Sequence, residues 1–152
     1  MEKIVVTGLG ATTPLGGNVP DSWKALLNCE SGIRTMEEEW VSKFGLPVTF
    51  AGTAKVPSKE VLEVREIRRL DPSSQFALIA AREAWADANI SMAIHERVAV
   101  EFATGIGGVW TLLDAYDRLR ESGPSGVLPM TVPMLMPNGP AAAIGMDIAA
   151  RG

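Results

Sequence analysis

The chain has 152 residues, of which 47% are apolar and 21% charged, and its formal net charge is −4. This composition is typical of a single globular domain and disfavours disorder. A nucleic-acid-binding surface needs a basic excess, which this acidic chain lacks. Its one cysteine excludes an internal disulfide, and neither a signal peptide nor an apolar run of about 20 residues is visible. We therefore expect a soluble cytoplasmic protein.

The first half of the chain predicts one strand, one helix and a long excursion. Residues 3–7 (KIVVT) are β-branched and apolar, as in a buried strand, and a glycine-rich turn follows. A helix is predicted over residues 20–28, with Asp21 or Ser22 as its cap. Residues 33–60 carry scattered Pro and Gly and a short strand candidate at 47–51. We interpret them as a surface excursion and not as a separate domain.

The second half alternates helices with one more strand. A helix is predicted over residues 72–89, with Asp71 as its cap and Pro72 at its first position. Its many alanines predict close packing on both sides. The remaining elements, in chain order, are a strand at 98–103, a glycine-rich turn at 104–108, a helix at 109–121, a loop at 122–137 and an Ala-rich helix at 138–149.

Alternating strands and helices indicate an α/β layered fold with a mainly parallel sheet. Three strands are few for such a sheet, and the last helix consists almost entirely of small and apolar residues. A helix of that kind is usually buried in the centre of a larger fold. We therefore expect the chain to be an incomplete domain.

Neither glycine-rich turn matches a nucleotide-binding motif. The run GLGATT, residues 8–13, follows a strand, but Thr13 stands where a dinucleotide fingerprint needs its third glycine. Residues 104–108 lack the Lys-Ser/Thr pair of a P-loop, because Val109 and Trp110 follow. An anion-binding nest stays open for the second turn. Close approach of backbone to a neighbour or to an apolar ligand explains its glycines better.

The chain offers little for metal or nucleophilic chemistry. His95 lies between two predicted elements and is interpreted as a solvated loop residue. Cys29 follows the end of the first helix, where the negative end of the helix dipole disfavours a thiolate. With one histidine and one cysteine far apart, we expect no metal site and no cofactor.

A basic stripe is the clearest candidate for binding a partner. If residues 63–71 are helical, Arg65, Arg68 and Arg69 lie at i, i+3 and i+4 and share one face. The segment holds three basic and three acidic residues and is neutral overall. The stripe is suited to a phosphate or an acidic partner. An ordinary solvated face with salt bridges is the alternative.

Five blocks in chain order together resemble the elongating 3-oxoacyl-[acyl-carrier-protein] synthases, the type II beta-ketoacyl synthase family, over essentially the whole chain. The blocks are Val5–Gly10 with Thr13–Gly16, Trp23 with Leu26–Leu27 and Ser31–Ile33, Arg68–Asp71 with Gln75–Ala77, Thr104–Gly108, and Pro137–Asn138. Val109, Trp110 and Gly139–Pro140 depart from the family pattern.

The resemblance implies the thiolase-like fold, α-β-α-β-α in five layers, of which residues 1–152 would be the N-terminal part of the N-terminal domain, with no second domain. It implies a decarboxylative Claisen condensation of an acyl thioester with malonyl-carrier protein, in a cytoplasmic homodimer of fatty acid biosynthesis. The family's cysteine, two histidines and lysine would all lie beyond Gly152. No catalytic residue is therefore expected here, and the fragment alone should be inactive.

The resemblance assigns only binding roles to the residues of this chain. It places Ile106 in the wall of the acyl pocket, where a branched side chain limits chain length. It places Arg65, Arg68 and Arg69 where the family meets the acidic acyl carrier protein, with its phosphopantetheine-linked acyl and malonyl groups. It also places the loop at 127–137, which contains Met130, Met134 and Met136, near the acyl tunnel and the dimer interface. Core packing explains these methionines equally well.

Two other functions remain open. The parent could be a polyketide ketosynthase or its catalytically silent chain-length partner subunit, in which glutamine replaces the cysteine. The chain could also be a non-enzymatic module that binds the carrier protein through the arginine stripe.

Overall fold

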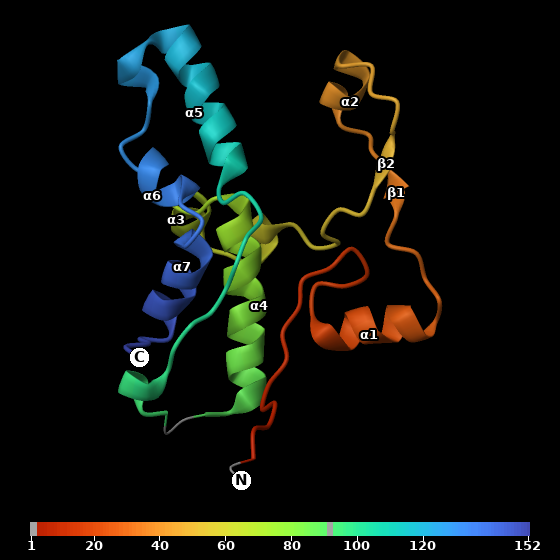
Figure 1. The fold of residues 1–152 in the computed structure, drawn as a ribbon. Coiled ribbons are helices and arrows are strands. Elements are labelled where there is room, and N and C mark those ends of the chain that lie inside the picture. Colours follow the sequence, from red (N-terminus) through yellow and green to blue (C-terminus); the bar gives the residue numbers. More distant parts are fainter. Residues whose placement is uncertain (1–2, 91–92) are drawn as a thin grey trace.

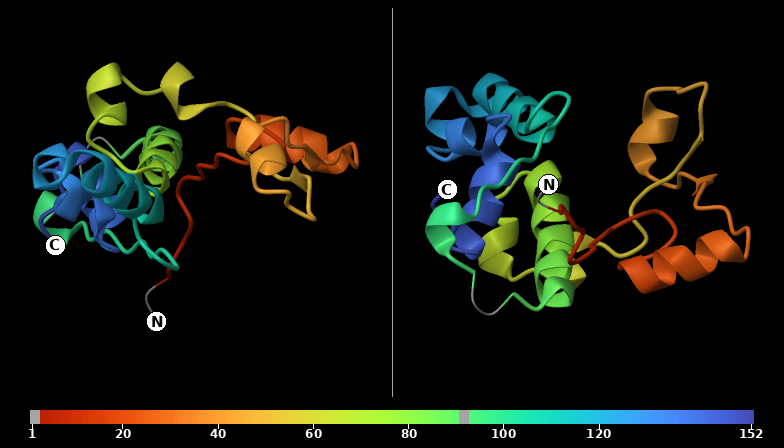
Figure 2. Two further views of the ribbon diagram at one scale, coloured as in Figure 1. Left: turned by 90° about the horizontal axis from the view of Figure 1, so that it is seen from above. Right: turned by 60° about the horizontal axis from the view of Figure 1, so that its bottom comes forward.

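The computed structural model describes residues 3–90 and 93–152, in which an N-terminal segment, residues 3–10, precedes an arm and a helical body (Figure 1). The arm, residues 11–57, holds α1 (Val19–Leu27), β1 (Arg34–Thr35), α2 (Glu39–Lys43) and β2 (Phe50–Ala51). The helical body, residues 58–152, holds the other elements: η1 (Ser58–Glu60), α3 (Val64–Ile67), α4 (Pro72–Ala88), η2 (His95–Arg97), α5 (Val109–Ser122), η3 (Pro124–Gly126), α6 (Thr131–Leu135) and α7 (Gly139–Asp147). Figure 2 shows the arm apart from the body in both further views.

The predicted helices are confirmed. Helix α4 spans Pro72–Ala88, with the Asp71 side chain accepting the Ser73 amide, as its sequence signature predicts. The helices predicted over 20–28, 109–121 and 138–149 correspond to α1, α5 and α7. Neither predicted cap of α1 was right, because the helix begins at Val19 and Asn18 caps it. The predicted loop 122–137 contains the short helices η3 and α6, which the proline-rich sequence concealed.

The predicted strands are largely wrong as hydrogen-bonded elements. The one sheet in the described residues pairs β1 with β2, antiparallel, with Arg34 opposite Ala51. Only the end of the 47–51 candidate is therefore a strand. Residues 3–7 and 98–103 join no ladder in this structure, and no parallel sheet forms in the part described. A strand exists only with a paired neighbour, and these segments lack one here.

The missing ladder leaves apolar side chains in solvent. Ile4 is 99% exposed and Val6 81%. The total accessible surface is 11149 Å², against about 7,500 Å² expected for a compact monomer of this mass. Residues 98–103 make one backbone hydrogen bond to another segment, because the Gly152 amide donates to the Val98 carbonyl at 2.9 Å.

The N-terminal segment, residues 3–10, lies along α4 (Figure 1). A Cβ at Gly8 or Gly10 would overlap the backbone of α4 at Ala84 or Ala80, so only glycine permits this approach. Side chains of α4 hold the segment and the arm that follows. The Asp87 carboxylate accepts the Leu9 amide, and Glu83 accepts the amides of Ala11 and Val19 at 2.9 and 2.8 Å. The close packing predicted from the alanines is confirmed on this face.

The core of the body is small. Leu62, Leu78 and Ile79 form a buried cluster, against which Ile67 and Leu70 pack. Helix α7 packs along α4, as both ribbons show in Figure 1. The Arg82 guanidinium of α4 joins them, because it binds Asp147 of α7 and Glu66 of α3. An apolar cluster and the ionic bridge of Arg82 thus both join elements of the body.

Candidate functional site

The arginine segment, residues 64–70, consists of α3 and the residues that connect it to α4. Arg65 lies in α3, Arg68 is its C-cap, and the Arg69 amide still donates to the Glu66 carbonyl, so the helical turn continues. The three arginines are exposed, and within the described residues none of them forms an ion pair. The arginines thus form a solvated face, as the alternative predicts, but one without the salt bridges that it also predicts.

A cavity of about 410 Å³ opens beside the arginine segment. Arg65 and Arg69 border it, whereas Arg68 does not. Its other walls are apolar side chains from α4, α7 and the segments next to α3 and α6, together with two acidic residues: Leu70, Leu78, Met130, Ala143, Met146, Glu66 and Asp147. We call it the arginine hollow.

Arg82 forms ion pairs with both acidic residues of this hollow, Glu66 and Asp147. The guanidinium Nη2 lies 2.6 Å from both Glu66 Oε1 and Asp147 Oδ1, and Nε donates to Asp147 Oδ2 at 3.0 Å. The hydrogen bond from Arg82 holds the pKa of Glu66 below its ordinary value of 4.5. The two carboxylates in turn raise the pKa of Arg82 above its usual range. In the part of the chain that the structure describes, Arg65 and Arg69 form no ion pair, so these two cations of the hollow favour an anionic partner.

The glycine loop, residues 104–108, places Ile106 at an exposed tip. Ile106 is 74% exposed and borders neither the arginine hollow nor the cavity of the arm. The base of the loop is tight: the Gly107 amide donates to Thr104 Oγ1 at 2.6 Å, and the Gly108 amide donates to the Leu135 carbonyl. Gly107 has φ of +78°, and a Cβ on it would crowd the Leu135 oxygen at 2.6 Å. Here the prediction of close backbone approach is confirmed.

Asp71 is the buried polar residue whose long-range role the sequence did not reveal. Its side chain is 1% exposed and lies between the arginine segment and the glycine loop in the fold. Oδ1 accepts the amide and hydroxyl of Ser73, while Oδ2 accepts the amide and hydroxyl of Thr111 at 3.0 and 2.8 Å. The sequence showed the helix cap, but nothing in it marks Thr111, 40 residues away, as the second partner.

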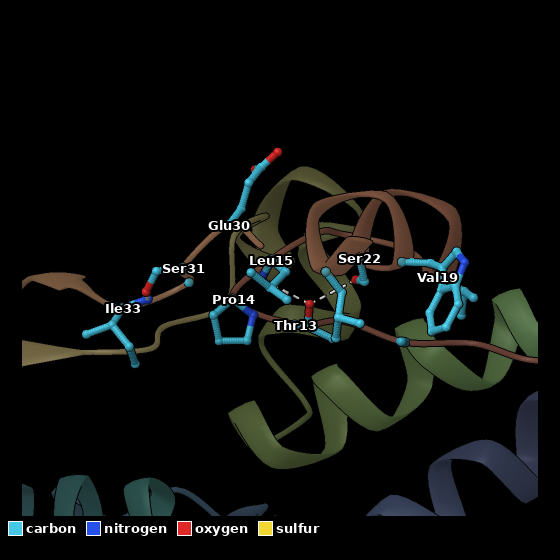
Figure 3. Close-up of a pocket in the computed structure, with 12 residues that line it drawn as sticks. Thr13, Pro14, Leu15, Val19, Ser22, Glu30, Ser31 and Ile33 are labelled. Carbon is cyan, nitrogen blue, oxygen red and sulfur yellow. Dashed lines mark hydrogen bonds between the residues drawn. The ribbon is translucent and has the colours of Figure 1, made fainter. Parts of the chain in front are cut away.

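The arm has its own cavity, of about 560 Å³, next to α1. Figure 3 shows Val19 and Ser22 of α1 beside Thr13, Pro14 and Leu15. Thr13 Oγ1 accepts the amides of Leu15 and Gly16 and lies 2.9 Å from Ser22 Oγ, so these two hydroxyls at the cavity have partners within the arm. The remaining wall is mostly apolar.

His95 is solvated as expected, although it lies in the short helix η2 and not in a loop. Cys29 is an exposed free thiol one residue after the C-cap of α1. Among the described residues, no three His, Cys, Asp or Glu side chains gather as a metal site would require. None of the helices in the described ranges is long and apolar enough to cross a membrane.

Comparison with known proteins gives one consistent result. A family model described as "Beta-ketoacyl synthase, N-terminal domain" matches residues 1–152. The 3-oxoacyl-[acyl-carrier-protein] synthase 2 of Mycobacterium tuberculosis (strain H37Rv) is 35% identical over 144 residues, covering 95% of this chain and 34% of the relative. Its Staphylococcus aureus (strain COL) counterpart is 32% identical, covering 99% of this chain and 37% of the relative. The chain therefore spans about a third of the length of these relatives.

Solved structures agree on the fold. A beta-ketoacyl synthase from Burkholderia phymatum superposes on the whole of this chain with a TM-score of 0.80 at 23% identity, over 38% of that chain. The ishigamide ketosynthase/chain length factor gives a TM-score of 0.73 at 18% identity, covering 96% of this chain and 37% of that one. The described residues thus have the thiolase-like α/β fold in part.

Proposed function

Because this chain belongs to the beta-ketoacyl synthase family, we propose that it forms the N-terminal part of a 3-oxoacyl-[acyl-carrier-protein] synthase. That enzyme would join an acyl thioester to the malonyl group of a carrier protein by decarboxylative condensation, in fatty acid biosynthesis. The observation that carries the proposal is the family match over residues 1–152, together with 32–35% identity to relatives of that name.

In this proposal the chain is an incomplete domain that is inactive alone. The chain would contribute no catalytic residue, and the reactive cysteine and histidines would come from the rest of the enzyme. The accessible surface supports that view, because it is about half again as large as the surface expected for a compact monomer of this mass. The exposed apolar residues of the N-terminal segment would be covered in the complete cytoplasmic enzyme, which we propose to be a homodimer.

The first binding role belongs to the arginine segment. Arg65, Arg68 and Arg69 would dock the acyl carrier protein, which is acidic and would meet three exposed and unpaired cations. Among the structural neighbours, one is described as a type II polyketide acyl-carrier protein in complex with its ketosynthase. That complex involves a protein only 16% identical to this chain. It supports the choice of partner but not the contact residues.

Reversing charge at Arg68 and Arg69 tests this docking in the complete gene product. The double variant Arg68→Glu/Arg69→Glu should bind the carrier protein about tenfold more weakly, and the loss should be greater at low salt. Lys24→Glu/Arg34→Glu changes the net charge equally but lies in the arm, and it should bind normally. Equal affinities for the two double variants at low salt would remove the arginine segment from the docking surface.

The second binding role belongs to Ile106. Its exposed side chain at the tip of the glycine loop would complete the acyl pocket when the rest of the enzyme covers it. Ile106→Phe should lower kcat/KM for the longest accepted acyl chain by at least about tenfold while shorter chains still react. Ile94→Phe, at another exposed isoleucine of the body, is the control. A length profile that does not change in Ile106→Phe contradicts this role.

A polyketide ketosynthase, or its chain-length partner subunit, is the second candidate. The structural neighbours from polyketide systems favour it as an alternative, but they share only 16–18% identity with this chain. Sequencing the gene beyond codon 152 separates the candidates: a cysteine in the nucleophile position supports a condensing enzyme, and a glutamine supports the silent subunit. A carrier-binding module without enzymatic activity would show carrier affinity and no condensation.

A further inference from the structure

The carboxylate of Asp71 caps two helices at once. Oδ1 serves α4, where it accepts the Ser73 amide and hydroxyl, and Oδ2 serves α5, where it accepts the Thr111 amide and hydroxyl. Thr111 is the third residue of α5, the position whose amide a capping side chain normally binds. The N-cap residue of α5 itself is Gly108, which has no side chain to offer. Asp71 therefore supplies from α4 the cap that α5 lacks.

The same carboxylate sits at the end of the arginine segment. Arg69 precedes it by two residues. The buried side-chain amide of Gln75 holds the backbone on both sides of Arg68 and Arg69. Its Nε2 donates to the carbonyl oxygens of Ile67 and Leu70, at 3.3 and 2.8 Å. The backbone that carries the arginines is thus fixed to the first turn of α4. A movement of that backbone would reach Asp71 directly.

On its other side, Asp71 fixes the base of the glycine loop. A Cβ on Gly108 would overlap the Met134 carbonyl oxygen and would lie 3.1 Å from the Asp71 Cγ, so only glycine lets the loop close between α6 and the carboxylate. The tip of the loop has more space, because a Cβ at Gly105 would meet nothing within 4 Å, and Ile106 is largely exposed. The loop therefore has a fixed base and a free tip.

We propose that Asp71, through Thr111, is a positioning residue that ties the arginine segment to the loop carrying Ile106, so that carrier docking and acyl-length selection are coupled. This inference rests on the proposed function, which assigns docking to the arginines and chain length to Ile106. It goes further because it gives a role to Asp71, which is 1% exposed, and to Thr111, neither of which is among the binding residues proposed above.

The test uses Thr111→Val in the complete gene product, because this change removes one donor to Asp71 and preserves side-chain shape. The measurement is kcat and KM for acyl-carrier substrates of several chain lengths. We expect the ratio of kcat/KM between the longest and shortest accepted chains to change at least about threefold, the coupling typical of a shared hydrogen-bond network. Thr111→Ser restores the hydroxyl and should restore the ratio. Thr49→Val, at an exposed threonine of the arm, should leave it unchanged.

A merely structural role gives a different result. If the hydroxyl of Thr111 only stabilises the fold, Thr111→Val lowers every rate in proportion and the length ratio stays at its wild-type value, which would overturn the proposal. Asp71→Asn provides a second variant, since its carboxamide nitrogen cannot accept a hydrogen bond. It should shift the same ratio in the same direction.

Failure of the proposed function can be distinguished from failure of this inference. A wild-type gene product that condenses no acyl thioester refutes the function, and hydrogen exchange then tests the tie by itself. In Thr111→Val the amides of Gly107 and Gly108 should exchange faster than in Thr49→Val, because the loop base has lost a support. Equal exchange in the two variants contradicts the tie between Asp71 and the loop.

Discussion

The helical body and the arm are held together in different ways. Of the nine apolar residues that are buried within ranges 3–90 and 93–152, seven lie in the body and two, Ala25 and Val41, lie in the arm. The arm exposes its large apolar side chains instead: Trp23 is 60% exposed and Phe44 68%. It is attached to α4 by backbone amides that donate to Glu83, and it follows directly on a segment that packs by glycine contacts.

This difference shows which interactions hold each region in place. The body has a cluster of apolar residues, and its buried carboxylate and ionic bridge join elements that are already in contact. The arm has no such cluster, so its placement depends on a few close approaches and hydrogen bonds. Single changes at those points should therefore release the arm or the segment before it and leave the body folded.

The largest expected effect comes from adding a methyl group where the N-terminal segment contacts α4. Gly10→Ala places a methyl group on the Ala80 carbonyl of α4, so the segment must move away. The expected loss in the free energy of unfolding of the complete gene product is about 1–3 kcal/mol, measured by urea denaturation. Gly105→Ala, where the added methyl meets open space, is the matched control and should cost less than about 1 kcal/mol. Equal losses in the two variants would mean that the segment does not lie on α4.

A smaller effect is expected at the attachment of the arm. Glu83→Ala removes the acceptor of the Ala11 and Val19 amides, each in a charge-assisted hydrogen bond. We expect a loss of about 1–2 kcal/mol and roughly tenfold faster hydrogen exchange at these two amides. Amides within α7 should keep their protection. Glu121→Ala, at the end of α5, is the control, and an arm with unchanged exchange would contradict the attachment.

The smallest effect concerns the ionic bridge of the body and depends on pH. Because the Arg82 hydrogen bond lowers the pKa of Glu66 from 4.5, this contribution to stability is present above pH 4.5 and is lost as pH falls through the lowered pKa. Arg82 is partly exposed, so Arg82→Met should cost only about 0.5–1 kcal/mol near neutral pH. The difference from wild type should shrink in acid. Arg118→Met, whose partner Asp114 is exposed, should show a smaller dependence, and a flat profile for Arg82→Met would contradict the bridge.

The helices were predictable because their signals are local. Asp71 and Pro72 mark the start of α4 within two residues, and the glycines at 104–108 mark the turn before α5. The arginine stripe was also visible, since its spacing needs only one helical turn. The resemblance supplied the family correctly, because its five blocks occur in chain order across the whole chain.

What the sequence did not predict depends on distant partners. The strands at 3–7 and 98–103 have the composition of buried strands, but a ladder needs neighbours that these residues do not provide for one another in this structure. The division between Arg65 and Arg69, which border the hollow, and Arg68, which does not, follows from how α4 and α7 pack. The link from Asp71 to Thr111 spans 40 residues, and neither residue type indicates the other.

The most direct measurement is condensation itself. The complete gene product would be incubated with acyl-carrier protein and malonyl-carrier protein, and the product would be analysed by mass spectrometry. We expect a carrier-bound 3-oxoacyl chain two carbons longer than the acyl substrate, together with carbon dioxide and the free thiol of the carrier that delivered the acyl group. Recovery of unchanged acyl-carrier protein, from a product that is folded and binds the carrier, would contradict it.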